Sequence, residues 1–426
     1  MQDSPLRIYS QLQTKLSAHH WINFSLTFFS VAAVTSVWKT LANVKPSLVE
    51  EWTQLPQDNI RPSSTWYSYG YFYGSDSANL FLGGLDSSFL FLNTLGLFLI
   101  GPLGDKLKSY RKWMLVAAMA SSVVFTCLFG TLPDQLSFFN PVYMVCLWAI
   151  NGLAQSPVIP LTMAMQANWF GKHRRGMVFG IWSTNLSVGN IMSNLMCLWS
   201  LQYGYSYCFT VNNFILATAL IWVISGLTQT PEQLGLDPVV EFDQKDIEEN
   251  EEQHSSHADP DRENLLDNLL FINGGASSPS GGGSLAASGE HSGIYSGTGF
   301  AIQTQAWRKR AIKLKEAWEF PGVGEFTLAY TAVKVVIYSL NLWLPYYITQ
   351  IYDTSNLIAI RYAAFFDLGS IAGGICLGLI VDRLHYKSLL LSTGIITSAF
   401  VCFIFCKFAE SQFVVAVLLT LIGKSD

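Results

Sequence analysis

Three charged residues stand inside long apolar segments of the chain, where they could bind a charged solute. They are Lys334, Asp86 and Asp367. A charge at the centre of a membrane helix costs about 2.5–3.5 kcal/mol or more, so each is a functional hypothesis. A lysine ammonium can replace water around an anionic ligand. We therefore predict that Lys334 is deeply buried and binds substrate. The alternative is a structural ion pair between Lys334 and Asp86 or Asp367.

Asp86 and Asp367 occupy corresponding places in the two halves of the chain. Each precedes a copy of a Gly-x-x-x-Asp motif, and the two offsets differ by about one helical turn, so both should project from a similar face. One of them could pair with Lys334 in an empty cavity and release it when an anionic ligand arrives. Equally, each could form a hydrogen bond with a neighbouring helix and have no part in ligand binding.

The repeated motif indicates two homologous halves. It reads Gly101 to Asp105 followed by Lys106, and Gly378 to Asp382 followed by Arg383, each time where an apolar stretch meets a basic loop. Glycine lets helices approach closely, and the aspartate can cap a helix or hold a basic residue. We expect gating and packing roles for Gly101, Asp105, Gly378 and Asp382. Paired halves in a membrane chain are typical of solute transporters.

The composition is that of a membrane protein. Half of the residues are hydrophobic and only 13% are charged, compared with about 25% in soluble domains. Nine stretches are long enough to cross a bilayer, and a tenth begins near Gln412 and ends within the sequence. The nine are Trp21–Val37, Leu80–Leu103, Trp113–Leu132, Pro141–Met165, Gly176–Leu201, Cys208–Leu227, Phe326–Ile348, Ala363–Val381 and Ser388–Phe408.

These spans predict an all-α polytopic membrane protein with a 6+6 arrangement of helices. Residues 1–228 should form a six-helix bundle and residues 229–320 a mostly disordered linker, because the linker is acidic, then rich in Gly and Ser. Residues 321–426 should form helices 7–10, which makes the C-terminal half incomplete. Lys and Arg are concentrated in alternate loops, so we expect a cytosolic N-terminus and a cytosolic linker.

Histidine and cysteine argue against several other functions. All seven His lie outside the spans, and the seven Cys lie inside them without metal or redox spacing. We find no cluster of nucleophile, base and oxyanion donor either. We therefore expect no enzyme activity, no metal, no cofactor and no nucleic-acid partner.

One loop resembles a known family. Residues 168–182, which read NWFGKHRRGMVFGIW and include Lys172, Arg174 and Arg175, are similar to the signature of the sugar-phosphate exchangers of solute carrier family 37. These belong to the organophosphate:phosphate antiporter branch of the major facilitator superfamily. The resemblance implies a 6+6 transporter that exchanges a small anionic sugar phosphate for phosphate by alternating access. It also implies an endomembrane location, with the endoplasmic reticulum preferred and the lysosome as alternative, and leaves an accessory membrane subunit open.

The chain departs from this family at two candidate binding positions. Trp38 stands where the family carries Arg, and the neighbouring Lys39 is rotated by about 100° around the helix. Asn185 stands where several members carry His. Trp38 could be an interfacial aromatic or could line the cavity. These departures, with the expected incomplete C-terminal half, leave an alternative open. The chain could be a substrate-shifted or non-transporting relative that acts as a binding or scaffold membrane protein. It could also be a nonfunctional truncated product.

Overall fold

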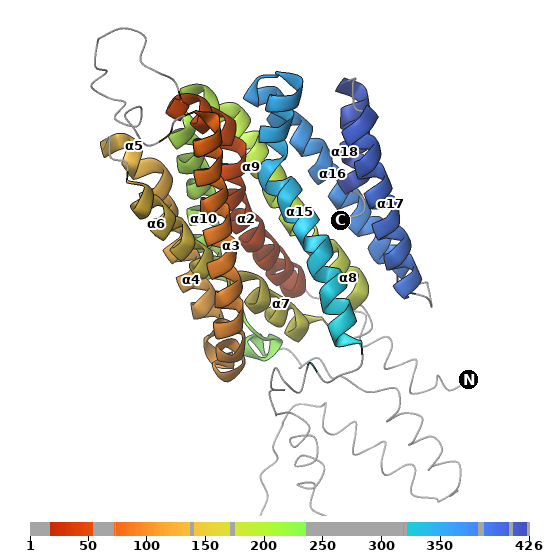
Figure 1. Cartoon of the computed structure of the whole chain (residues 1–426). Helices are drawn as coiled ribbons and strands as arrows, with labels where there is room; N and C mark the ends of the chain where they lie inside the picture. The colour runs from red at the N-terminus through yellow and green to blue at the C-terminus, as the bar shows by residue number, and fades with distance from the viewer. Residues whose placement is uncertain are drawn as a thin grey trace, which may run out of the picture. The chain divides into compact units, whose positions relative to one another are not determined.

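The computed structural model describes residues 18–53, 72, 74–136, 140–170, 175–235, 318, 322–381, 387–408 and 412–423. These residues fall within one compact unit and form helices and short connections without a strand. Figure 1 shows the helices of the N-terminal part together, with α15 to α18 beside them. The expected all-α fold is therefore confirmed for the described part of the chain.

The helices of the N-terminal part correspond to the first six predicted spans. They are α2 (Ala18–Thr53), α3 (Ser75–Lys106), α4 (Arg111–Thr126), α6 (Pro141–Gln155) with α7 (Val158–Trp169), α8 (Arg175–Ser183) with α9 (Asn185–Ser200), and α10 (Tyr205–Gly226). Between α4 and α6 lie η3 (Cys127–Thr131), a π-helical turn, and α5 (Leu132–Leu136); η2 (Lys108–Tyr110), η5 (Leu201–Tyr203) and η6 (Pro231–Leu234) are short 3₁₀ turns. The start of α6 follows from its sequence, because the Asn140 side chain accepts hydrogen bonds from the backbone N–H groups of Val142 and Tyr143.

The C-terminal part supplies four more helices. These are α15 (Val323–Tyr352), α16 (Asn356–Val381), α17 (Lys387–Phe408) and α18 (Gln412–Gly423). Their shared core includes Leu344, Ile348, Phe366, Leu419 and Ile422. A Cβ added at Gly369 or Gly423 would run into the backbone of the facing helix, so α16 and α18 approach each other closely at glycine.

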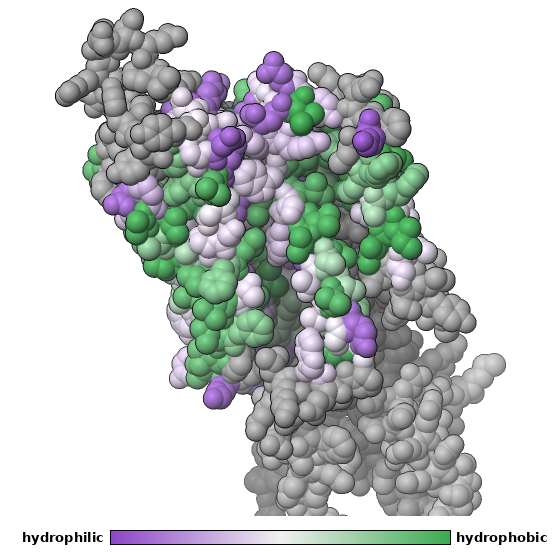
Figure 2. All heavy atoms as spheres, in the orientation of Figure 1, coloured by the Kyte–Doolittle hydropathy of each residue, from purple (hydrophilic) through white to green (hydrophobic). Residues whose placement is uncertain are grey.

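The helices have the length and surface of membrane spans. Within the described residues, seven helices are long and apolar enough to cross a bilayer, and α17 and α18 contain shorter apolar helices. Large apolar side chains point outward, for example Leu80, Phe98, Phe214 and Ile221. Figure 2 shows apolar side chains over much of the helical face in view. In lipid, a helix satisfies every backbone N–H and C=O internally, which explains why such runs fold as helices.

Three predicted spans differ from the structure. The first span does not end at Val37, because α2 continues through Lys39, Lys45 and Pro46 to Thr53. The eighth span begins at Asn356 rather than Ala363. The fifth is broken at Thr184 into α8 and α9. In the first case, buried partners for the two lysines allow the helix to continue where the sequence suggested a polar end.

The two halves pack through α15 and α16, which contact α2, α8 and α9. Asn356 at the start of α16 donates hydrogen bonds to Asn43 O (3.0 Å) and Ser47 Oγ (2.9 Å) on α2. Tyr346 of α15 accepts a hydrogen bond from Asn79 of α3 at 2.6 Å. The first half therefore holds the second by polar contacts as well as by apolar packing.

Candidate functional site

Two lysines of α2 lie at the contact between the halves. Lys39 is 1% exposed and Lys45 is fully buried. Both lie inside a helix that is long and apolar enough to span the membrane. Because an unpaired ammonium is costly in such a place, the partners of each lysine define the chemistry of the site.

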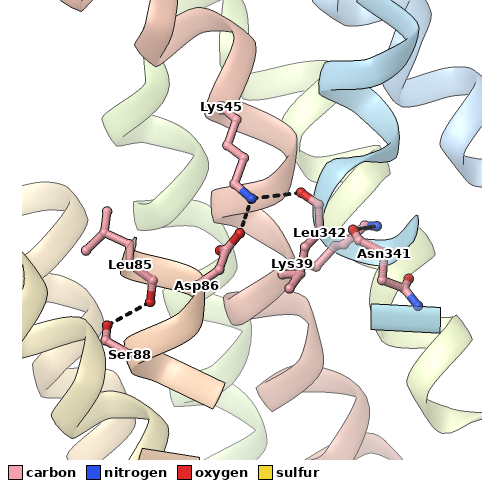
Figure 3. Close-up of polar contacts among 7 residues, drawn as sticks. All are labelled: Lys39, Lys45, Leu85, Asp86, Ser88, Asn341 and Leu342. Carbon is pink, nitrogen blue, oxygen red and sulfur yellow. Dashed lines mark hydrogen bonds and ion pairs between the residues drawn. The ribbon is translucent and has the colours of Figure 1, made fainter. Parts of the chain in front are cut away.

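Lys45 binds groups from both halves. Its ammonium forms an ion pair with Asp86 of α3 and donates a hydrogen bond to the backbone carbonyl of Leu342 in α15 at 2.9 Å. Figure 3 shows the Lys45 ammonium between these two oxygens. The ammonium also lies 3.9 Å from the ring centroid of Trp343, within range of a cation–π contact. Lys45 thus joins α2, α3 and α15.

Lys39 lies about two helical turns earlier and reaches the same helix. Its ammonium donates a hydrogen bond to the backbone carbonyl of Asn341 at 2.6 Å. The carboxylate of Asp367 in α16 attracts it electrostatically. An ammonium has three N–H donors, and the described residues occupy one of those of Lys39 by a hydrogen bond. The remaining donors suit an anionic ligand.

Asp367 is held by amides of the first half. Its two carboxylate oxygens accept hydrogen bonds from Asn190 (2.8 Å) and Asn194 (3.0 Å), which are four residues apart on α9. Asn190 also donates to the side-chain oxygen of Asn341 at 2.9 Å. Asp367 is 1% exposed, so these donors replace the water that a carboxylate would otherwise require.

The structure places Lys334 differently from the prediction. It is only half-buried, so the expectation of deep burial was wrong. Its ammonium lies near two tyrosine rings of its own helix, 5.4 Å from the centroid of Tyr330 and 5.9 Å from that of Tyr338. The proposed ion pair with Asp86 or Asp367 is not among the described contacts, where these carboxylates bind Lys45 and the two asparagines.

Trp38 lies near the middle of α2 and not at its end. Its ring stacks on Phe89 of α3, with centroids 6.4 Å apart, and meets Tyr338 of α15 edge-on at 6.2 Å. The interfacial-aromatic interpretation assumed that the first span ends near Val37, and α2 instead runs to Thr53. The contacts with Phe89 and Tyr338 place Trp38 between the halves, as the cavity interpretation requires.

With phosphate as the ligand, as the resemblance to solute carrier family 37 implies, Trp38→Arg is expected to raise the affinity for this anion by about tenfold, or 1.4 kcal/mol. Charge-assisted hydrogen bonds contribute about 1.5–3 kcal/mol. The guanidinium could remain stacked between the rings of Phe89 and Tyr338. Equilibrium binding of labelled phosphate to the purified protein measures the change. Trp38→Leu is the control and should give no gain. Equal affinity in the Arg variant and the wild type would show that position 38 does not reach the anion.

The other predicted residues fall into two groups. Asn185 is buried, and its side-chain amide donates a hydrogen bond to the carbonyl of Trp182 at 2.5 Å. This bond stabilises the break between α8 and α9. A substrate role for Asn185 stays a prediction.

The gating residues lie mostly at the edge of the described structure. Gly101 and Asp105 belong to α3, Gly378 to α16 and Arg175 to α8, but the side chains of Asp105 and Arg175 are outside the described residues, as are Lys172, Arg174 and Asp382.

One contact lies at the first motif, for which the packing role of Gly101 and Asp105 stays a prediction. Arg111 follows that motif, and its Nε donates a hydrogen bond to the carbonyl of Gly104 at 3.1 Å. A Cβ at Gly104 would lie 3.3 Å from Leu161 of α7. The motif thus combines a close helix approach with a basic residue that binds its backbone.

Sequence reasoning missed five residues of the site: Lys45, Asn190, Asn194, Asn341 and Trp343. Lys45 lies beyond the predicted end of the first span at Val37, so its burial was not expected. Asn190 and Asn194 carried a usable signal, since two amides four residues apart share one helix face. Asn341 and Trp343 gave no comparable signal. The lysines bind backbone carbonyls of α15, and every residue type has a backbone carbonyl, so the sequence does not mark the ones that are bound.

A helical membrane bundle in two halves, with buried charges where the halves meet, is the architecture of a secondary transporter. The family profile of the Major Facilitator Superfamily matches residues 21–425. Sugar phosphate exchanger 3 of Homo sapiens is 33% identical over 97% of this chain and 77% of the human protein. The Glucose-6-phosphate exchanger SLC37A2 of Danio rerio is 28% identical over 94% of this chain and 75% of that protein.

A solved structure shows the same fold. The xylose transporter XylE from E. coli, in a partially occluded inward open conformation, matches with a TM-score of 0.57 at 14% identity, over 96% of this chain and 82% of that one. The chain belongs to the sugar phosphate exchangers of solute carrier family 37, within the Major Facilitator Superfamily. The alternative of a non-transporting scaffold or a nonfunctional product is not favoured by these similarities.

Proposed function

We propose that this protein exchanges a sugar phosphate for inorganic phosphate across a membrane by alternating access. The names of its relatives support phosphorylated solutes as the substrate class. The observation that carries the proposal is the burial of Lys39 and Lys45 between the halves, with an ammonium donor of Lys39 left for a ligand. We assign Lys39 as the principal substrate cation and Lys45 as the second.

The charges of the site explain how it could be stable without substrate. Two ammonium groups, from Lys39 and Lys45, face two carboxylates, from Asp86 and Asp367. Such a balance lowers the cost of keeping lysines inside a membrane protein. A phosphate dianion that enters would compete with the carboxylates and carbonyls for the same ammonium donors. Lys334 remains a candidate for contact with the substrate nearer the exposed part of α15.

Counterflow in proteoliposomes tests the function. Vesicles that contain the purified protein and unlabelled phosphate should accumulate labelled phosphate, and external glucose 6-phosphate should release that label. Glucose without a phosphate group is the control and should have no effect. Absence of phosphate counterflow in vesicles with correctly folded protein would overturn the proposal, and release by glucose would contradict the assigned substrate class.

We also propose that the N-terminus and the loop 229–320 face the cytosol, in an endomembrane for which the endoplasmic reticulum is preferred over the lysosome. The alternation of Lys and Arg between loops supports this orientation. In sealed microsomes with the cytosolic face outward, added protease should cleave the loop without detergent. Cleavage that requires detergent would reverse the orientation. Co-localisation with markers of the two organelles decides between the compartments.

A further inference from the structure

Pro345 has a consequence for the backbone of α15. It lies inside this helix, where every residue but proline donates its N–H to the carbonyl four residues earlier. For Pro345 that carbonyl belongs to Asn341. The proline ring also pushes this carbonyl away from the helix axis. The sequence therefore creates a carbonyl oxygen within a membrane span that needs a donor from elsewhere.

The donor comes from the other half of the protein. Lys39 of α2 donates to Asn341 O at 2.6 Å, and Lys45 donates to the next carbonyl, Leu342 O, at 2.9 Å. Asn341 is 7% exposed and both lysines are almost fully buried, so water does not compete strongly for these bonds. Two cations of the first half thus hold two successive carbonyls of the second.

We propose that Pro345 is a positioning residue that makes these contacts a latch. The latch consists of the Lys39 and Lys45 ammonium groups on the Asn341 and Leu342 carbonyls. It rests on the proposed function, because the same ammonium groups are the ones assigned to substrate. In the empty protein the latch holds α2 to α15 and resists the rocking of one half against the other. A bound phosphate supplies oxygens that replace the carbonyls, so the loaded protein reorients more easily than the empty one.

This arrangement makes exchange obligatory. If the empty protein reorients slowly, phosphate leaves a vesicle only when another substrate enters. Pro345→Ala restores a backbone N–H, which competes with Lys39 for Asn341 O and weakens the latch. Net efflux of phosphate into substrate-free medium should then rise relative to exchange, lowering the ratio of exchange to net efflux by about tenfold, which corresponds to about 1.4 kcal/mol of barrier.

The test measures both fluxes in the same proteoliposomes loaded with labelled phosphate. Pro46→Ala is the matched control, because Pro46 also lies inside a helix, α2, and its substitution restores an N–H facing Ala42. The ratio should fall in Pro345→Ala and stay at the wild-type value in Pro46→Ala. Pro345→Gly, which restores the same N–H, serves as the second variant if Pro345→Ala does not fold, and the same fall is expected.

Each outcome separates the two proposals. A wild-type protein that does not exchange phosphate refutes the proposed function. A wild type that exchanges, with Pro345 variants that remain as tightly coupled, refutes the latch and leaves the function standing. An equal fall in the ratio of exchange to net efflux in Pro46→Ala also refutes the latch. Removing a proline from any helix would then be sufficient to lower the ratio.

Discussion

Replacing Lys39 with methionine is expected to reduce phosphate exchange by about 100-fold in kcat/KM. Truncating one partner of a buried, hydrogen-bonded charge costs about 2–5 kcal/mol, and 100-fold corresponds to about 2.7 kcal/mol. Folding should suffer moderately, because Asn341 O loses the donor that Lys39 supplies, while Asp367 keeps its hydrogen bonds from Asn190 and Asn194. Initial rates of exchange over a range of phosphate concentrations, together with thermal melting of the purified variant, measure the two effects separately.

Two further variants make this expectation specific. Lys39→Arg keeps the charge in a larger and more rigid group, so part of the exchange activity should remain. Lys334→Met removes a half-buried lysine whose described contacts are two tyrosine rings, and should reduce exchange less than Lys39→Met does. A larger loss for Lys334→Met would return the role of principal cation to α15, where the sequence alone placed it.

The fold could be predicted from the sequence because lipid leaves few alternatives for an apolar run of about 20 residues. The described helices follow the order of the predicted spans from Trp21 onward. The main error, the end of the first span, arose because Lys39 and Lys45 interrupt the apolar run that precedes them. Their burial depends on Asp86 and on the carbonyls of α15, which are far away in the sequence and invisible to any local pattern.

The site could be predicted only in part, for a similar reason. The cost of a buried charge directed attention to Asp86 and Asp367, and both are buried between helices with hydrogen-bonding partners. Their partners depend on which helix faces which, and the helical period alone does not determine that. Lys334 had the same signal, yet it is half-buried, because the early part of α15 is largely exposed, with Phe326 62% and Leu328 74% exposed.

Removing one member of the buried Lys45–Asp86 ion pair should strongly destabilise the protein. Lys45→Met is expected to destabilise the protein by about 3–5 kcal/mol, because it leaves the Asp86 carboxylate buried without its cation. It also removes the hydrogen bond to Leu342 and the contact with the Trp343 ring. Thermal melting in detergent should show a clear fall in Tm. Lys106→Met, at the exposed end of α3, is the control and should melt like the wild type.

The double variant Lys45→Met with Asp86→Leu separates charge from packing. Replacing both members of a buried ion pair with apolar groups of similar volume is often neutral or stabilising, so melting should recover towards the wild-type Tm. Exchange should not recover, because the second substrate cation is still absent. A double variant as unstable as Lys45→Met would mean that the bond to Leu342 O, and not the charge of Asp86, determines stability here. Recovery of exchange along with melting would remove Lys45 from the binding site and leave Lys39 as the only cation of α2 that the transported anion requires.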